Sequence, residues 1–587
     1  MYCNFTIMKK LHLILGIFMF AQFGNAQQND SYESLWEQVE KFEGEDLSKS
    51  ALELIETISK KAHLEKNKTQ IIKSLLYKSK FALILEENAE LNIVNDFKAE
   101  IGIAEGASKN ILHNYLANIY WQYFQQNRYK FYNRTSTETK VDTVDFRTWD
   151  LNTLFQEIDI HFQASLENPV ALQKLPISNF NVILNEVKES SEFRPTLFDL
   201  LAHTALSFYT TSENSIQKPA DAFEIEETEV LCEAYSFSFI NSETNNTTSL
   251  QSKALKIYQQ LVSFHFGNAD IRPLVLVDIE RLLFIHQFAT FSDKDNLLIE
   301  VLQNSAENIK NSPLSGLYTY EIANRYQQMG GTYNPQSSKE HQWKLKEAIA
   351  LCDKVVATFP KSRAAEKCQI LKSQIETPFI QLLTEKHIPN NTIGRLLVTY
   401  KNYENIQLTA YRISQKEVQA LNELYPEAKK LSFLKNLPIE TTWNSTLTTE
   451  NDFQTHSTEI TMPAMANGYY AILAQSKDKS DSYFSYQTVQ ATDFALSETQ
   501  STTHQLYQVI DRNNGKPIES AKVIFNYRKN YNSPAKSENF TTDSQGKFSI
   551  KKNKDSRSSI YITIKKDKEI AYFGDYYINR NYTQNTA

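Results

Sequence analysis

The stretch from Tyr507 to Ile550 constrains the fold most, because it alternates short β-prone runs with turn residues. The run Asp511–Gly515 (DRNNG) supplies a turn, since Asn and Gly tolerate positive φ angles. The run Ala521–Tyr527 (AKVIFNY) alternates in the way a strand with one buried face does. A second turn, Thr542–Gly546, leads into another alternating run. The stretch therefore predicts antiparallel β structure, with Pro517 where its missing N–H costs no central ladder bond.

The order of these residues, D-R-x-x-G-K-P-x-x-x-A-x-V and then T-D-x-x-G-x-F, resembles a macroglobulin domain of the alpha-2-macroglobulin family. The resemblance implies an antiparallel β-sandwich in a large secreted or periplasmic protein that traps proteases. The same spacing is similar to transthyretin-like (carboxypeptidase regulatory-like) sandwich domains. On the residues alone, the motif serves turns and core, because turn Gly, Asp and Asn have sufficient backbone reasons to be there.

A β-prone character begins earlier, at Thr377, with the runs FIQLLTE, RLLVTYKN and NIQLTAYRI. Residues 453–474 then contain H-S-x-E-x-x-x-P-x-x-x-x-G-x-Y, which resembles the closing half of a first macroglobulin domain. The run Asp493–Leu496 would begin a second one. We therefore expect two sandwich domains, residues 377–492 and 493–587.

Residues 27–376 are predicted to form an α-helical, repeat-like region, since apolar residues recur there at three- and four-residue spacing. Pro195 is expected to open one helix, which carries His203 on its apolar face as a core histidine. The last helix pair before 376 resembles a tetratricopeptide-like hairpin, but no strict period recurs. The expected fold class is thus α+β multidomain: a helical solenoid-like region followed by two antiparallel sandwiches.

The N-terminus has the pattern of a signal peptide: Lys9-Lys10, the apolar run Leu11–Phe20, and small residues before Ala26. We expect cleavage after Ala26, with Met8 as an alternative start, and export to the periplasm or the extracellular space. The apolar run is too short to span a bilayer, so the mature chain is expected to have no transmembrane segment. The net charge of −7 implies no general attraction to nucleic acid or anionic membranes.

Three cysteines remain once Cys3 leaves with the signal: Cys232, Cys352 and Cys368. Cys352 and Cys368 lie eight residues before and after Pro360, so they would face each other in an antiparallel helix pair. Packed helices lie about 8–10 Å apart, which lets facing Cα atoms reach the roughly 4.4–6.8 Å of a disulfide. We therefore predict a Cys352–Cys368 disulfide with Cys232 as the odd thiol. The alternative is a pair of buried free thiols.

No catalytic constellation is present in the sequence. The family's thioester needs Cys-x-x-Gln, and the residues three positions after the four cysteines are Thr6, Tyr235, Val355 and Leu371. The motifs HExxH, CxxC, GxSxG and the Walker loop are also absent. We expect no enzyme activity, no cofactor and no metal ligands.

Two functions are open at this point. The resemblance implies that the chain is the N-terminal part of a macroglobulin-like protein that inhibits endopeptidases by physical trapping, with proteases as partners. A cell-wall synthase is a further partner by analogy with some bacterial relatives. The alternative is a surface or periplasmic structural or adhesion module that presents transthyretin-like sandwiches on helical repeats. The sequence that follows Ala587 would distinguish the two.

Overall fold

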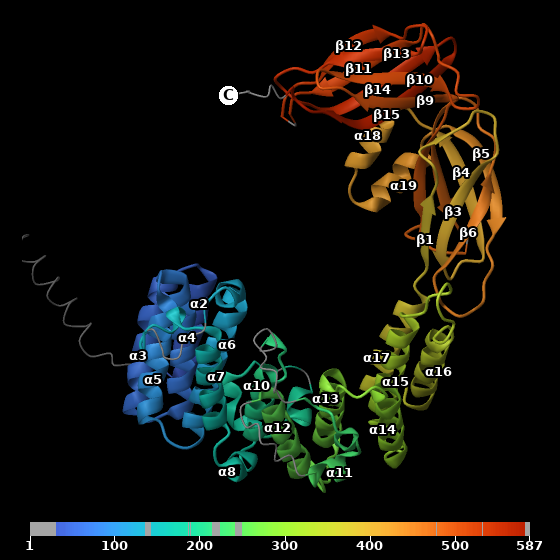
Figure 1. Ribbon diagram of the computed structural model, residues 1–587. Helices are drawn as coiled ribbons and strands as arrows, with labels where there is room; N and C mark the ends of the chain where they lie inside the picture. Colours follow the sequence, from blue (N-terminus) through green and yellow to red (C-terminus); the bar gives the residue numbers. More distant parts are fainter. Residues whose placement is uncertain are drawn as a thin grey trace, which may run out of the picture. The chain divides into compact units, whose positions relative to one another are not determined.

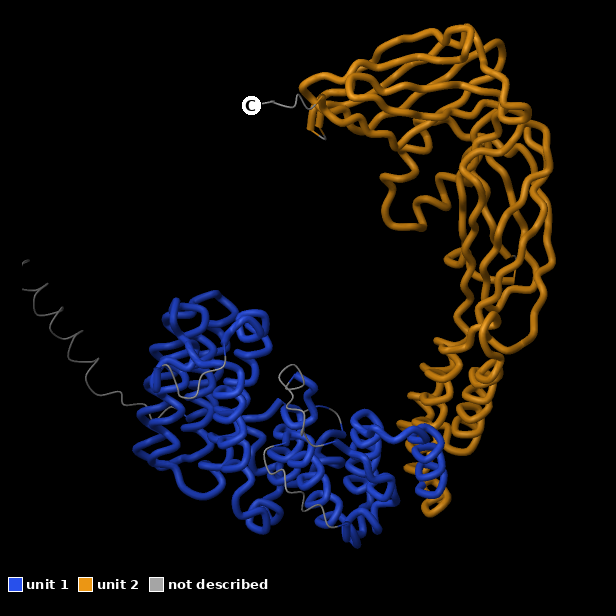
Figure 2. Tube along the Cα trace, in the orientation of Figure 1, with its two compact units in different colours: residues 1–305 blue, residues 306–587 orange. Residues whose placement is uncertain are grey.

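The computed structural model describes residues 31–581, apart from 136–141, 186, 188, 214–223, 241–248, 477 and 531. The described chain runs from helices into mainly antiparallel sheets, so this is an α+β multidomain protein (Figure 1). It divides into two compact units, residues 1–305 and 306–587 (Figure 2). The predicted signal peptide lies outside the described residues. The unit boundary falls inside the predicted helical region, and the domain limits at 376 and 492 stay predictions.

Unit 1 is helical in its described part. Its longer helices are α2 (Tyr32–Gly44), α3 (Ser48–Leu64), α4 (Lys68–Leu85), α5 (Ala89–Ile103), α6 (Ala107–Tyr132), α7 (Leu151–Ser165), α10 (Leu197–Tyr209), α12 (Leu250–His265) and α13 (Arg272–Phe288). Short helices are η1 (Phe146–Thr148), α8 (Pro169–Gln173), η2 (Ile177–Ile183), α9 (Ser190–Phe193), η4 (Thr228–Val230) and α11 (Ala234–Ser238). Helix α14 (Lys294–Asn308) crosses the unit boundary. The solenoid-like and tetratricopeptide-like character stays a prediction.

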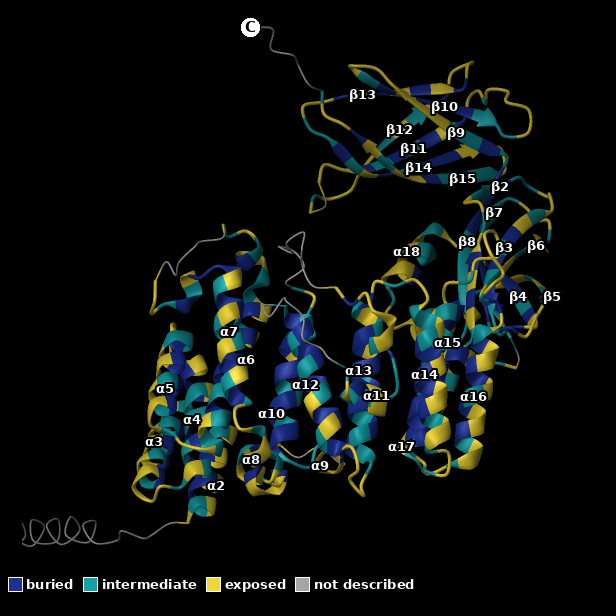
Figure 3. Ribbon diagram, turned by 60° about the horizontal axis from the view of Figure 1, so that its bottom comes forward, coloured by how far each residue is buried: buried dark blue, intermediate teal, exposed yellow. Residues whose placement is uncertain are grey.

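Aromatic side chains hold the middle of unit 1 together. Trp121 of α6 packs edge-on against Phe155 of α7 and Phe208 of α10, with ring centroids 5.9 and 5.3 Å apart. Helix α10 buries nine of its 13 residues and is mostly dark blue in Figure 3. It begins at Leu197, not at Pro195, because Thr196 and Asp199 form a capping box that satisfies the first N–H groups.

Unit 2 begins with the helices α15 (Ser315–Gly330), α16 (Lys344–Thr358) and α17 (Arg363–Glu376). The first sandwich follows. Its strands are β1 (Phe379–Leu383), β2 (His387–Ile388), β3 (Gly394–Lys401), β4 (Asn405–Arg412), β5 (Ile439–Thr446), β6 (His456–Met462), β7 (Gly468–Gln475) and β8 (Ser485–Ala491). They form one sheet of order β1-β3-β6 and one of order β2-β8-β7-β4-β5. Inward residues of both sheets, such as Val398 and Ile472, belong to one hydrophobic cluster, as in a β-sandwich.

Two helices that the sequence analysis missed, α18 (Gln415–Glu423) and α19 (Glu427–Lys435), follow β4. Leu421, Leu431 and Leu434 of these helices pack in one cluster with Tyr411 of β4 and Leu473 of β7. The helices therefore cover the outer face of the five-stranded sheet, and the first sandwich has a third layer.

The second sandwich consists of β9 (Phe494–Gln500), β10 (His504–Asp511), β11 (Lys522–Arg528), β12 (Lys536–Thr541), β13 (Lys547–Lys551), β14 (Arg557–Lys566) and β15 (Glu569–Ile578). Its sheets have the orders β13-β10-β9 and β12-β11-β14-β15 and share a single core cluster. On β11 the buried residues are Val523, Phe525 and Tyr527, which confirms the predicted alternation.

Candidate functional site

The motif of the second sandwich serves its turns. Asp511 accepts hydrogen bonds from the N–H groups of the next turn residues, and Gly515 follows with a φ of 71°. Gly546 has a φ of 69°, and a Cβ there would lie 2.3 Å from the carbonyl oxygen of Val509. Thr542 accepts from the Ala521 N–H at 2.8 Å and so ties the second turn to β11. The motif residues are positioned for folding, as the turn interpretation expects.

The motif of the first sandwich is structural in the same sense. Tyr470 is fully buried, and its hydroxyl donates to the carbonyl of Ala466 at 2.9 Å. Arg412 donates to the same hydroxyl at 2.9 Å and lies over the ring. Gly468 is next to this pair, where a Cβ would lie 2.9 Å from the Arg412 guanidinium. The glycine leaves room for the arginine to pack on the tyrosine.

The cysteines are where the helix pairing predicts them. Cys352 on α16 and Cys368 on α17 are fully buried, and each thiol shifts the pKa of the other. The hydrogen bond to Cys368, together with burial, raises the pKa of the Cys352 thiol. Both are thiols in the structure, and a disulfide between them stays a prediction. Burial also raises the pKa of Cys232, which is half-buried.

The histidines of unit 1 pair with other side chains. His203 lies 2.8 Å from the carbonyl of Asp199 and 3.1 Å from Glu280. The Nδ1 atoms of His113 and His161 lie 2.9 Å apart, and burial lowers the pKa of His113 to about 4. Over the described residues, no group of three or more His, Cys, Asp and Glu is arranged to hold a metal ion. These histidines therefore link neighbouring helices.

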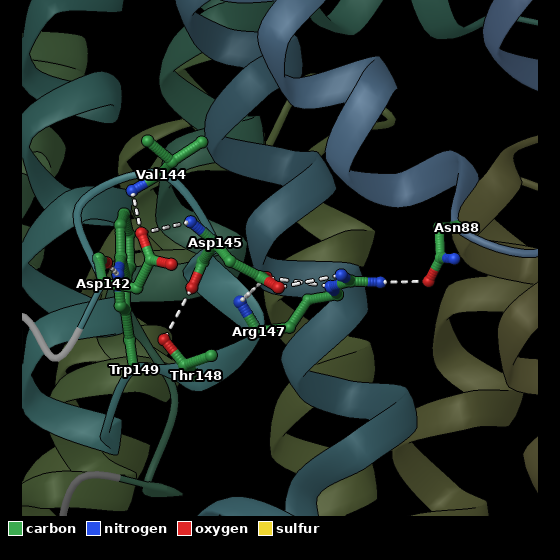
Figure 4. Close-up of polar contacts among 7 residues, drawn as sticks. All are labelled: Asn88, Asp142, Val144, Asp145, Arg147, Thr148 and Trp149. Carbon is green, nitrogen blue, oxygen red and sulfur yellow. Dashed lines mark hydrogen bonds and ion pairs between the residues drawn. The ribbon is translucent and has the colours of Figure 1, made fainter.

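A polar network joins the loop before α7 to the start of α5 (Figure 4). Arg147 donates from Nε and Nη2 to Asp145 at 2.8 Å, and from Nη1 to Asn88 at 2.7 Å. The hydrogen bond from Arg147 lowers the pKa of Asp145. The carbonyl of Asp142 accepts from the Trp149 indole at 2.5 Å. Each of these bonds closes the loop on itself or fastens it to α5, so the network stabilises a loop conformation.

Two junctions beside the first sandwich, a helix junction and a sandwich junction, carry polar networks in unit 2. At the helix junction, the buried Gln454 donates to the carbonyls of Gly330 and Gln342 at 3.1 and 3.2 Å. Gln342 donates in turn to Asp452 at 3.1 Å. Asp452, 1% exposed, also accepts from the Gln454 N–H at 3.0 Å and lies 2.9 Å from His456. This network fastens the loop after β5 to helices α15 and α16.

A cavity of about 510 Å³ adjoins that loop. Its lining includes the carboxylates of Glu376, Glu404, Glu450, Asp452 and Asp478. A second cavity of about 370 Å³ shares Phe453 and Gln454 with it. Because no metal-holding group is present in the described part of the chain, the carboxylates are not assigned as ligands.

At the sandwich junction, side chains of the first sandwich bond to the backbone of β15. Asn467 accepts from the Ile570 N–H at 3.0 Å and donates to the Ile570 carbonyl at 3.2 Å. Gln490 likewise accepts from the Tyr572 N–H at 2.8 Å and donates to the Tyr572 carbonyl at 3.2 Å. The ring of His387 stacks on Phe573 with centroids 4.9 Å apart. Sequence reasoning missed these residues, because the partners are 82 and 103 residues apart and share no local pattern.

No family model and no curated protein matches this chain. A crystal structure of Escherichia coli alpha-2-macroglobulin spanning domains MG0-NIE-MG1 is 14% identical, with a TM-score of 0.26. The match covers 34% of this chain and 64% of that one. A crystal structure of the same protein spanning domains NIE-MG1 is 13% identical over 34% of this chain and 97% of that one, also with a TM-score of 0.26.

The native E. coli alpha-2-macroglobulin solved by electron microscopy is 13% identical, with a TM-score of 0.23. That match covers 34% of this chain and 12% of that one. With all three TM-scores below 0.5, these matches do not establish a shared fold or family. Among the described helices, none combines the length and the apolar character needed to cross a bilayer.

Proposed function

We propose that this chain is the N-terminal part of an exported macroglobulin-like protein, in which it serves as a non-catalytic scaffold for the physical trapping of proteases. One observation carries the proposal. Two sandwiches with macroglobulin-like motifs follow each other directly, and β8 of the first ends at Ala491, three residues before β9 of the second begins at Phe494. A shell that encloses a protease needs consecutive domains joined in this way.

Three features support the non-catalytic part of the proposal. The motif residues Asp511, Gly515 and Gly546 hold turns. The pKa of Cys232 is raised by burial, which disfavours the reactive thiolate. None of the cysteines is followed by Gln three residues later, so this portion supplies no thioester.

The proposed localisation is the periplasm or the extracellular space, after the signal peptide is cleaved between Ala26 and Gln27. It is supported by the basic, apolar and small-residue order at the N-terminus. Proteases are the proposed partners. A cell-wall synthase as a further partner is proposed only by analogy with some bacterial macroglobulin-like proteins.

The test uses the full-length product of the natural gene. The protein is incubated with trypsin, and residual activity is measured on a large protein substrate and on a small chromogenic peptide. Trapping predicts loss of cleavage of the large substrate while the small one is still cut. The heat-denatured protein is the control.

Equal cleavage of both substrates would contradict trapping. Binding of intact cells or matrix with no effect on either substrate would favour the adhesion module instead.

A further inference from the structure

Strand β15 is an edge of its sheet, with only β14 beside it. An edge strand normally leaves a row of N–H and C=O groups open to other chains. Ile570 and Tyr572 lie two positions apart, so their backbone groups point to the same side of the strand. Those groups bond to Asn467 and Gln490, so they face away from β14.

The two carboxamides complete this row. A carboxamide offers one acceptor oxygen and a donor N–H₂, as a residue of a paired strand offers one acceptor and one donor. Asn467 and Gln490 together bond both N–H groups and both carbonyls of Ile570 and Tyr572, at 2.8–3.2 Å. The side chains thus occupy the place of a neighbouring strand.

The carboxamides are themselves held in place. Gln490 is fully buried, and Asn467 donates a second bond to the Ala491 carbonyl at 3.0 Å. At the start of β15, Glu569 accepts from the Asp493 N–H at 2.6 Å and from the Thr492 hydroxyl at 2.8 Å. These bonds fix the short connection between the sandwiches to the same strand.

We infer that Asn467 and Gln490 form a carboxamide latch, which closes the open edge of β15 at Ile570 and Tyr572 and makes the two sandwiches of unit 2 move as one body. The latch does not depend on protease trapping, because it concerns only contacts within this chain.

The first measurement uses the natural sequence: residue-resolved hydrogen exchange along β15. The amides of Ala571 and Phe573 face β14 by strand alternation and should be protected. The latch predicts that Ile570 and Tyr572 are protected as well. Exchange of Ile570 and Tyr572 at the rate of an open edge would overturn the inference, whatever any variant does.

The second measurement uses the double variant Asn467→Asp with Gln490→Glu. These isosteric changes keep the acceptors but turn a carboxylate oxygen toward each β15 carbonyl. Exchange at Ile570 and Tyr572 should rise at least about tenfold, while Ala571 and Phe573 stay protected.

Spin labels at Thr442→Cys and Asn539→Cys, in a Cys232→Ser background, should show a broadened distance distribution in this variant. The matched control is Gln381→Glu with Asn444→Asp, which adds the same charge at exposed positions of β1 and β5. A latch variant with the narrow distribution of the control would overturn the inference.

Discussion

The two junctions of unit 2 both use carboxamides to bond backbone groups, but they differ in what surrounds those carboxamides. At the helix junction, Gln342 and Gln454 meet a buried carboxylate, Asp452, with His456 beside it. At the sandwich junction, Asn467 and Gln490 bond backbone groups: those of Ile570 and Tyr572 on β15 and, for Asn467, the carbonyl of Ala491 on β8. The carboxamides therefore have different partners at the two junctions: the backbone of a strand edge at one, and a buried carboxylate together with loop carbonyls at the other.

The largest effect on stability is expected in helices α16 and α17, on the helical side of the helix junction. A Cys352–Cys368 disulfide would close a loop of about 15 residues, so reduction should lower the free energy of unfolding by about 3 kcal/mol. Thiol counting in the denatured, non-reduced exported protein should give one per chain. The Cys232→Ser variant should give none, with little change in stability. Three thiols in the natural protein would contradict the disulfide.

The Gln454→Leu variant should destabilise the helix junction by about 2 kcal/mol, because it removes the side-chain donor to the buried carbonyls of Gly330 and Gln342, of which the first keeps the Tyr333 N–H. Urea unfolding followed by tryptophan fluorescence measures this. Gln381→Leu is the matched control, since Gln381 is exposed on β1, and it should change stability by less than about 0.5 kcal/mol. Similar losses in both variants would show that the Gln454 bonds contribute little.

The Asp452→Asn variant should lower the free energy of unfolding by about 1 kcal/mol at pH 7. The size of this decrease should depend on pH. Burial alone would raise the pKa of Asp452, but bonds from His456, the Gln454 N–H and Gln342 lower it below 3.8. The ionised carboxylate therefore stabilises the fold fully above pH 3.8, and this contribution disappears as the pH falls through the folded pKa. The difference in urea midpoint between the variant and the natural protein should be smaller at pH 3 than at pH 7. A constant difference would refute the assignment.

The smallest effect is expected at the sandwich junction. Burial lowers the pKa of His387 from 6.5, so the neutral ring is favoured in the folded protein. The neutral His387 ring contributes fully to the free energy of unfolding above pH 6.5. This contribution falls by less than about 1 kcal/mol as the pH decreases toward the folded pKa. His387 Nε2 lies 3.2 Å from the Tyr572 carbonyl. The natural protein should therefore lose more stability between pH 7.5 and 5.5 than His387→Gln, which keeps a donor for that carbonyl. Equal losses of stability in the two proteins would show that His387 does not cause the pH dependence.

Local chemistry predicted the elements of the sandwiches well. The turns at Gly515 and Gly546 and the alternation on β11 follow from backbone freedom and side-chain period, so they are readable in sequence. Helix α18 had a readable start as well, because Ser414 and Glu417 form a capping box, whereas α19 follows Pro426 without a side-chain cap. That signal was missed within a β-prone region.

The junctions could not be predicted in the same way. Gln490 has no sequence feature that distinguishes it from other glutamines, and its partner Tyr572 is 82 residues away. A contact of this kind depends on the folded positions of both sandwiches. The cysteine pair lies between these cases, since helix geometry placed the two thiols together but leaves their oxidation state to experiment.

The latch bonds to the backbone of Ile570 and Tyr572, and this has a consequence for sequence drift. Side chains at these two positions can change in related proteins without loss of the bonds, except to proline, which lacks the N–H. Asn467 and Gln490 have no such freedom, because the side chain itself is the binding group. Across a set of relatives, we therefore expect the sandwich junction to preserve its two amides while the strand that they hold diverges.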